Sequence, residues 1–206
     1  MKLIEQEILP FQEKHFFIPI RDKIDYARVI IFATRNLLLD INNDDIECNS
    51  KMKLLVDKMS RLFFYKEKKY FSLSFPFITL IDNNKVTKIN TLTGKSITNQ
   101  SLSSALLVLN DEQFKLNPSL LDYYIQANNG ESIGISILEE IFQSEPAYVR
   151  YDYDIDNEDG KKHPLNHLDI NYSSYGTYKL GLNNIITESN LEDVLNINTD
   201  CSYLDK

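Results

Sequence analysis

The chain has 206 residues, of which 43% are hydrophobic and 25% are charged, a composition typical of a folded globular protein and not of a disordered or fibrous one. A chain of this length buries roughly 70% of its unfolded surface, so a single domain over residues 1–206 needs neither a metal nor a disulfide for its core. The net charge of −8 disfavours nucleic acid as a partner of the whole surface, but residues 51–100 hold ten basic and three acidic residues and form a local basic segment.

The N-terminal part, about residues 1–70, is predicted to be helical. Residues 22–41 place apolar side chains at helical spacing, and Asp22 is a suitable N-cap. After a polar turn, residues 51–69 repeat the helical spacing and predict a second helix.

A central hairpin is predicted over about residues 71–93. Two runs rich in β-branched and aromatic residues flank the turn sequence DNNK, and Pro76 indicates an edge or a bulge in the first strand. Residues 97–130 are ambiguous, because SSALLVLN fits either a buried strand or a helix. Helices are predicted from Pro118 onward and over residues 132–143.

The C-terminal part predicts a β-meander over about residues 147–182. Residues 147–155 alternate as a strand, and residues 167–173 and 177–182 follow as antiparallel strands. Residues 187–195 predict a closing helix. The expected fold is therefore α+β, with a helical N-terminal half packed on antiparallel strands.

The compartment is predicted from the absence of export signals. Cys48 and Cys201 lie far apart without metal-ligand spacing, which favours a reduced thiol state. Glu5, Glu7 and Glu13 interrupt what would be the apolar region of a signal peptide, and no run reaches 18 uncharged apolar residues. We expect a cytoplasmic protein that does not enter a membrane.

The strongest functional pattern lies in the C-terminal meander. Two of the three histidines, His163 and His167, follow shortly after Arg150 and Asp152. Alternate residues of a strand point to the same side, so Arg150 shares a face with Asp152, and His167 shares a face with Asp169. If the two faces coincide, these side chains converge, with His163 at the end of the connecting loop.

This set suits cleavage of RNA without a metal. Histidine transfers protons near neutral pH, and a neighbouring carboxylate orients its ring. Arginine binds phosphate oxygens and balances the charge that develops in the transition state. A base that activates the ribose 2′-hydroxyl and an acid that protonates the leaving oxygen would select RNA over DNA, which lacks that hydroxyl.

Structural and metal-binding alternatives use the same residues. Arg150 and Asp152 could form an ion pair while the histidines satisfy buried backbone groups. His163 and His167 with Asp169 could instead hold zinc or manganese in a metal-dependent nuclease.

A calcium loop is a further alternative for this segment. Asp152, Asp154 and Asp156 occupy positions 1, 3 and 5 of a calcium-type loop. Asn157 at position 6 and His163 at position 12 depart from the pattern, which requires glycine and glutamate there.

A second pattern lies in the basic segment. Arg61, Lys66, Lys68 and Lys69 alternate with aromatic residues, a combination that contacts phosphates and stacks on unpaired bases. We therefore expect these four residues to bind nucleic acid. The alternative is a solvated helix end, where basic residues interact favourably with the helix dipole.

The C-terminal motifs resemble a known family. RYDYD, then HPLNHLDINY and TYKLGL, are similar to an uncharacterised family of bacterial proteins with an Arg-Tyr-Asp stretch followed by a His-Pro-x-x-His-x-Asp stretch. Residues 147–182 are more distantly similar to TumE-type toxins of toxin-antitoxin modules, a resemblance that implies ribonuclease-like activity. Such a toxin has closely spaced histidines, whereas here Asp169 follows His167.

The leading prediction is a candidate metal-independent endoribonuclease without a cofactor, acting on RNA as a toxin or phage-defence component. The alternative is a non-enzymatic subunit whose acidic C-terminal sheet docks a basic protein partner in a defence or nucleic-acid-processing complex. Exposure of the histidines distinguishes the two, because an enzyme requires them in an open cleft and a docking subunit allows them to be buried against backbone groups.

Overall fold

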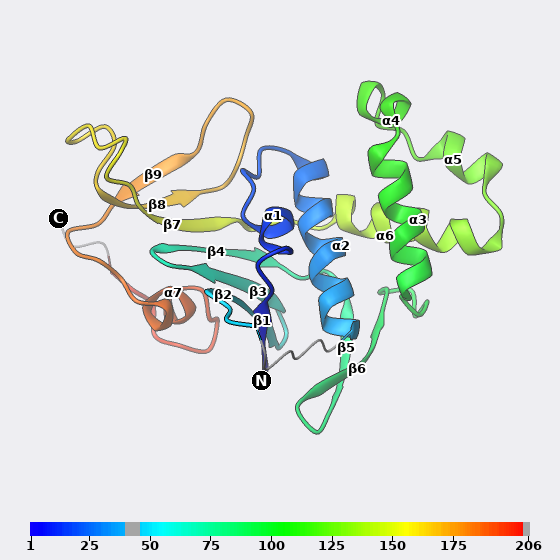
Figure 1. The fold of residues 1–206 in the computed structure, drawn as a ribbon, viewed down its shortest axis with the longest axis horizontal. Coiled ribbons are helices and arrows are strands. Elements are labelled where there is room, and N and C mark those ends of the chain that lie inside the picture. Colours follow the sequence, from blue (N-terminus) through cyan, green and yellow to red (C-terminus); the bar gives the residue numbers. More distant parts are fainter. Residues whose placement is uncertain (40–45, 204–206) are drawn as a thin grey trace.

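The structure, a computed structural model, describes residues 1–39 and 46–203 of the chain. It is an α+β fold with 33% helix and 28% strand, which confirms the predicted class. The sheet and a group of helices lie toward opposite ends of the longest axis (Figure 1). Among the described residues, no helix is both long and apolar enough to cross a membrane.

A seven-stranded antiparallel sheet forms the larger part. Its order is β1-β2-β3-β4-β7-β8-β9, so two meanders join where β4 pairs with β7. The strands are β1 (Lys2–Ile8), β2 (Ser50–Val56), β3 (Arg61–Lys66), β4 (Lys69–Ser74), β7 (Val149–Tyr153), β8 (Asn166–Ile170) and β9 (Tyr178–Gly181). Between β4 and β7 the chain forms a separate hairpin, β5 (Ile78–Asp82) and β6 (Lys85–Asn90), and four helices.

The described helices are α1 (Glu13–Phe16), α2 (Lys23–Leu39), α3 (Asn99–Asn110), α4 (Glu112–Leu116), α5 (Leu121–Gln126), α6 (Asn129–Gln143) and α7 (Glu188–Val194). Two of them, α2 and α7, lie on opposite faces of the sheet. The α2 helix packs on the face that belongs to the main core. The α7 helix covers the opposite face, where Leu191 packs with Tyr151 and Leu168.

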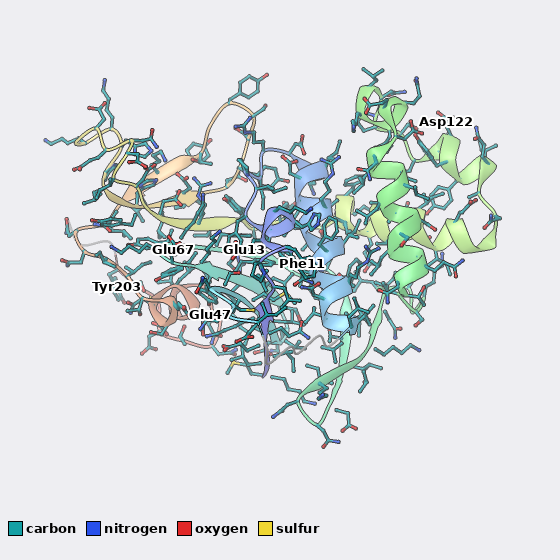
Figure 2. The ribbon with its side chains drawn as sticks, in the orientation of Figure 1. Phe11, Glu13, Glu47, Glu67, Asp122 and Tyr203 are labelled. Atoms are coloured by element: carbon teal, nitrogen blue, oxygen red, sulfur yellow. The ribbon has the colours of Figure 1, made fainter. Side chains whose placement is uncertain are left out.

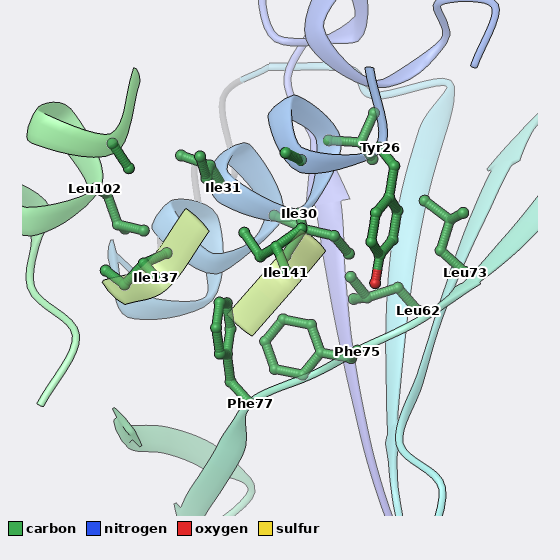
Figure 3. Packing of buried hydrophobic residues seen from close by; sticks show 14 of the residues in the cluster. Tyr26, Ile30, Ile31, Leu62, Leu73, Phe75, Phe77, Leu102, Ile137 and Ile141 are labelled. Atoms are coloured by element: carbon green, nitrogen blue, oxygen red, sulfur yellow. The ribbon is translucent and has the colours of Figure 1, made fainter. Parts of the chain in front are cut away.

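The main apolar core lies between α2 and the sheet and continues into α3 and α6. Ile30 of α2, Leu62 of β3 and Ile141 of α6 are completely buried in it, as Figure 3 shows. The Tyr26 hydroxyl, at the edge of this core, donates to the Ser74 carbonyl at 3.1 Å. Burial of these side chains supplies the main force that holds α2 on the sheet.

Several predicted elements are confirmed. The helix expected over residues 22–41 is α2, although residues 40 and 41 lie outside the described residues. The DNNK turn joins β5 to β6, and the C-terminal meander and closing helix are β7, β8, β9 and α7. The ambiguous SSALLVLN segment is helical and belongs to α3.

The prediction of a helix over residues 51–69 is wrong, because this segment forms β2 and β3. Both faces of β3 are buried: Leu62 and Phe64 point into the main core, while Phe63 and Tyr65 join a cluster on the opposite face. A strand buried on both faces is continuously apolar, and its periodicity cannot be distinguished from that of a buried helix.

The predicted helical N-terminal half is also wrong, since residues 1–70 contribute β1, β2 and β3 as well as α1 and α2. The first strand of the hairpin predicted over residues 71–93 is two separate strands in the structure. One part is β4 of the main sheet, and the other is β5 of the hairpin. The break falls at Phe75, Pro76 and Phe77, because proline cannot donate to a strand ladder.

Candidate functional site

Pairing of β7 with β8 brings four predicted site residues to one face of the sheet. Arg150 pairs with Asp169, and Asp152 pairs with His167. Directly paired residues point to the same side of a sheet, so the predicted convergence of these side chains is confirmed. Arg150 also pairs with Phe71, which belongs to the main core, so the site lies on the α2 side of the sheet.

Two carboxylates hold the guanidinium of Arg150. Its Nε atom lies 2.6 Å from Asp152 Oδ2, an ion pair without the alignment of a hydrogen bond. Its Nη2 atom donates to Asp169 Oδ2 at 2.5 Å. Burial alone lowers the pKa of Arg150, but the neighbouring Tyr148, Asp152 and Asp169 raise it above its usual value. The side chain of Arg150 stays 21% exposed, so this cation is both fixed and reachable from solvent.

Asp169 is the centre of the network and is only 1% exposed. Its Oδ1 atom accepts hydrogen bonds from Lys179 Nζ and Thr177 Oγ1, each at 2.8 Å. Burial raises the pKa of Asp169, but these hydrogen bonds and the charge of Arg150 outweigh it and lower the pKa below its usual value. Asp169 is therefore a carboxylate that neutralises two cations.

Lys179 is the site residue that the sequence prediction missed. It pairs with Asp169 across β8 and β9, and its ammonium donates to Asp169 and to His167. A signal was present in TYKLGL, because Thr177 and Lys179 alternate and so share a strand face. Only the register between β8 and β9 identifies which face that is.

His167 is completely buried and both of its ring nitrogens are occupied. Its Nδ1 atom lies 2.8 Å from the Pro164 carbonyl oxygen, and a carbonyl only accepts, so Nδ1 carries a proton and donates. Its Nε2 atom lies 3.0 Å from Lys179 Nζ and accepts a hydrogen bond from that ammonium. A neutral ring bound in this way has no route to a substrate, which is the structural alternative considered for the histidines.

His163 keeps partial access to solvent, with 24% of its side chain exposed. Its ring packs edge to face on His167 at a centroid distance of 4.6 Å, and its Nε2 atom lies 3.8 Å from Asp154 Oδ2. Its Nδ1 atom is buried and has no hydrogen-bond partner among the described residues. Of the two predicted proton-transfer residues, His163 is therefore the one that a ligand can approach.

The metal-binding alternatives fit this geometry less well. Asp152, His167 and Asp169 could each offer a ligand atom within 4.8 Å of the others. The Lys179 ammonium, however, already binds His167 and Asp169, and a second cation at that position would be repelled. In the calcium alternative, Asp152 contacts Arg150, whereas Asp154 accepts from the amide of Asn157, so the two carboxylates serve different partners.

The predicted basic patch adjoins this network across the β4–β7 pair. A cleft of about 500 Å³ opens between the β3–β4 turn and β7. It is lined by Phe17, Lys66, Glu67, Lys68, Lys69, Arg150, Asp152, Tyr153, Asp154 and Asn157. Figure 2 labels Glu67 at this turn. Three of the residues predicted to bind RNA (Lys66, Lys68 and Lys69) and two of those predicted to act on it (Arg150 and Asp152) thus line one cleft. His163, His167 and Asp169 are not in its lining.

The three lysines of the patch differ in how strongly they are held. Lys66 donates to Glu13 Oε2 at 2.6 Å and is already neutralised. Lys69 lies 4.0 Å from Asp152 and keeps 48% of its side chain exposed. The Lys68 ammonium lies 4.3 Å from the centroid of the Tyr153 ring. Lys68 and Lys69 are the cations most available to an anionic ligand.

Arg61 does not belong to the patch, and its prediction as a nucleic-acid-binding residue is corrected. It is 3% exposed, and its Nε and Nη2 atoms donate to Ser72 Oγ at 3.0 Å and to the Ala147 carbonyl at 2.6 Å. Burial lowers the pKa of Arg61 to about 10, which leaves it charged at neutral pH. A phosphate on the surface cannot reach this guanidinium.

Comparison of the chain with family models, with curated proteins and with solved structures finds no match. The resemblance of the C-terminal motifs to a bacterial family and to TumE-type toxins therefore stays a prediction from the residues themselves. Function has to be argued from the geometry of the site.

Proposed function

We propose that the chain binds RNA in the cleft between the β3–β4 turn and β7 and cleaves the bound strand. The observation that carries this proposal is the meeting of cations from both segments, Lys68 and Lys69 on one side and Arg150 on the other, in one open cleft. Phe17 and Tyr153 add aromatic side chains to the same walls. Cations beside aromatic rings suit a single strand with phosphates and unpaired bases.

The cleft also contains carboxylates, which define the mode of binding. Asp152 and Asp154 line it together with the lysines, so the net positive charge inside is small. Phosphate contacts by Lys68 and Lys69 would then be few, and the salt dependence of binding would be shallow. This matches an acidic protein that holds RNA locally and not along its whole surface.

Cleavage would use His163 for proton transfer. It lies beside Asp154, a residue of the cleft wall, and its ring is partly exposed. In this proposal His163 takes the proton of a ribose 2′-hydroxyl, whose oxygen attacks the adjacent phosphorus while the 5′ oxygen leaves and is protonated by water. Arg150 stabilises the charge on the phosphate oxygens. His167 is a positioning residue, because it supports His163 from within the sheet.

The first test is incubation of the purified protein with RNA and with DNA of the same sequence, with and without chelator. We expect RNA to be cleaved in both conditions and DNA in neither. His163→Ala should lower the rate by about 10²–10⁴-fold. His15→Ala is the matched control, since His15 stacks on Phe32, is not in the lining of the cleft, and should leave the rate unchanged.

Binding is tested separately from cleavage. The variant Lys68→Gln/Lys69→Gln should weaken RNA binding to a similar degree for all sequences, because phosphate contacts carry no sequence information. The control Lys58→Gln/Lys88→Gln removes two exposed lysines outside the cleft and should have no effect. Equal losses in the two variants would end the proposal that the cleft binds RNA.

A second candidate function is a non-enzymatic subunit that docks a protein partner. The burial of His167 against a backbone carbonyl favours it, because this is the state expected if the histidines are structural. If neither RNA nor DNA is cleaved under any of these conditions, the docking function replaces the enzyme. We place either function in the cytoplasm, since Cys48 and Cys201 are both free thiols. The role of a toxin or defence component is proposed from the resemblance of the C-terminal motifs alone.

A further inference from the structure

The helical part of the molecule contains a groove remote from the RNA cleft, apolar at one end and polar at the other. A cavity of about 370 Å³ lies between α3, α5 and α6, and Leu107, Val108, Ala127 and Ile135 supply its apolar lining. A second cavity, of about 280 Å³, adjoins it along α4 and α5, and the two share Asp111, Tyr123 and Gln126. Figure 1 shows these helices at the end of the molecule away from β8 and β9. We call the two adjoining cavities the α3–α6 groove.

Exposed aliphatic side chains occur on the wall of the groove and on the neighbouring α5. Leu107, on its wall, is 73% exposed. On α5, Leu121 and Ile125 are 66% and 75% exposed, and this helix has no buried residue. Tyr123 and Tyr124 pack α5 on the main core, and Leu121 and Ile125 line neither cavity. The exposed Leu107 side chain extends the apolar lining of the first cavity, and an exposed apolar wall of this kind is typical of an interaction site.

The charged residues that line the two cavities are all acidic. Residues 99–143 contain six acidic residues and a single basic one, Lys115. Lys115 is already bound to Glu112 at 2.6 Å. Asp111 and Glu131 line the first cavity, Asp122 lines the second, and neither cavity has a lysine, an arginine or a histidine in its lining. A partner that covers the aliphatic side chains and also carries positive charge would neutralise this rim.

Close helix packing keeps the groove in shape. A Cβ atom at Gly134 of α6 would lie 2.7 Å from Ser104 Cβ and 2.8 Å from the Ala105 backbone nitrogen of α3. These distances are shorter than any normal contact, so only glycine allows α3 and α6 to approach this closely. Two of the walls are therefore held before a partner arrives, which lowers the ordering cost of binding.

We propose that the α3–α6 groove docks a basic amphipathic helix of a partner protein. Apolar side chains on one face of that helix occupy the first cavity, and flanking lysines or arginines pair with the acidic residues that line both cavities. The charge complementarity of the rim selects this partner over an acidic or neutral one. The proposal is independent of the RNA cleft, which lies near the other side of the molecule, where Figure 2 labels Glu67 far from Asp122.

Three synthetic peptides of about four helical turns test the proposal by fluorescence anisotropy. The first combines leucines on one face with lysines on the other, the second replaces lysine by glutamate, and the third replaces leucine by serine. We expect the leucine–lysine peptide to bind the wild-type chain at least about tenfold more tightly than either of the others. Equal binding of the serine–lysine peptide would mean general attraction to an acidic protein and would overturn the proposal.

Two variants locate the binding. Leu107→Ser and Asp122→Lys should each weaken the leucine–lysine peptide by about tenfold. Their matched controls are Leu92→Ser, which changes a leucine that is 66% exposed outside the groove, and Asp156→Lys, which reverses an exposed charge in the β7–β8 loop. The controls should bind as the wild type does.

The remaining outcomes also decide the matter. No binding of the leucine–lysine peptide to the wild-type chain, or equal binding to the groove variants and the controls, would overturn the proposal. Sedimentation of the wild-type chain is measured alongside. A dimer that Leu107→Ser disrupts would assign the groove to a second copy of this chain and would also overturn the proposal of a basic partner.

Discussion

Two arginines on the same sheet, Arg61 buried and Arg150 partly buried, show how acceptors, and not burial alone, decide what a cation can do. Arg61 in β3 donates to a serine hydroxyl and a backbone carbonyl, and burial lowers its pKa. Arg150 in β7 contacts two carboxylates, which raise its pKa despite burial. Arg61 is buried, and its hydrogen bond to the Ala147 carbonyl links β3 to the residues just before β7. Arg150 keeps part of its surface in the cleft, so only its region can take part in binding.

The largest expected effect comes from removing the carboxylate that the Arg150 region depends on. Asp169→Asn leaves Arg150 and Lys179 without their shared counter-charge in a buried site. Breaking a buried ion pair in this way typically costs about 3–5 kcal/mol of unfolding free energy. Urea unfolding measures the loss, and Asp156→Asn, at an exposed position, is the control that should stay close to wild type. A loss as small as that of the control would contradict the central role of Asp169.

The Arg61 region should be less sensitive. Arg61→Met removes a cation whose partners are neutral, so no unpaired charge remains, and the unfilled hydrogen bonds cost about 1–2 kcal/mol. Arg150→Met leaves Asp152 and Asp169 close together and should cost more. Urea midpoints of the two variants, measured side by side, test the comparison directly. Equal losses would show that burial matters more than the type of acceptor.

Acid should weaken the Arg150 region selectively. The pKa of Asp169 is lower in the folded chain than its usual value, so the folded state favours the carboxylate. This stabilisation is complete above the unfolded pKa of about 4 and is lost as the pH falls through the lower, folded pKa. The gap in unfolding free energy between wild type and Asp169→Asn should therefore narrow below about pH 4, by at most ~1.4 kcal/mol per pH unit. A constant gap would mean that Asp169 acts through shape and not through charge.

The smallest effect concerns the backbone that Arg61 holds. Ala147 has a φ of 43°, a left-handed conformation that costs a residue with a Cβ about 1 kcal/mol. Its carbonyl accepts from Arg61 Nη2, which fixes the chain as it enters β7. Ala147→Gly should raise the free energy of unfolding by up to about 1 kcal/mol. The thermal midpoint should rise slightly as a result. In the Arg61→Met background, Ala147→Gly should raise the free energy of unfolding by less. Without the Arg61 hydrogen bond, the backbone at Ala147 is no longer held in the left-handed conformation.

Sequence patterns predicted the C-terminal part better than the N-terminal part, for a physical reason. In β7 and β8 the order Arg150, Asp152 and His167, Asp169 alternates polar side chains with apolar ones, and that period indicates a strand with one polar face. In β3 the run RLFFYK is apolar on both faces because α7, far along the chain, covers the outer one. No local sequence pattern reveals that α7 covers the outer face of β3. The apolar run was therefore interpreted as a helix.

The sequence by itself determined which side chains share a strand face, and therefore that Arg150, Asp152, His167 and Asp169 could meet. It also determined the DNNK turn and the α2 helix, because turns and helices depend on neighbours along the chain. Only the tertiary structure decided that His167 is buried, that Lys179 supplies the cation between His167 and Asp169, and that the β3–β4 turn forms a cleft with β7. These features depend on the pairing of β4 with β7 and of β8 with β9, and on burial. Both arise from contacts between segments that lie far apart in the sequence.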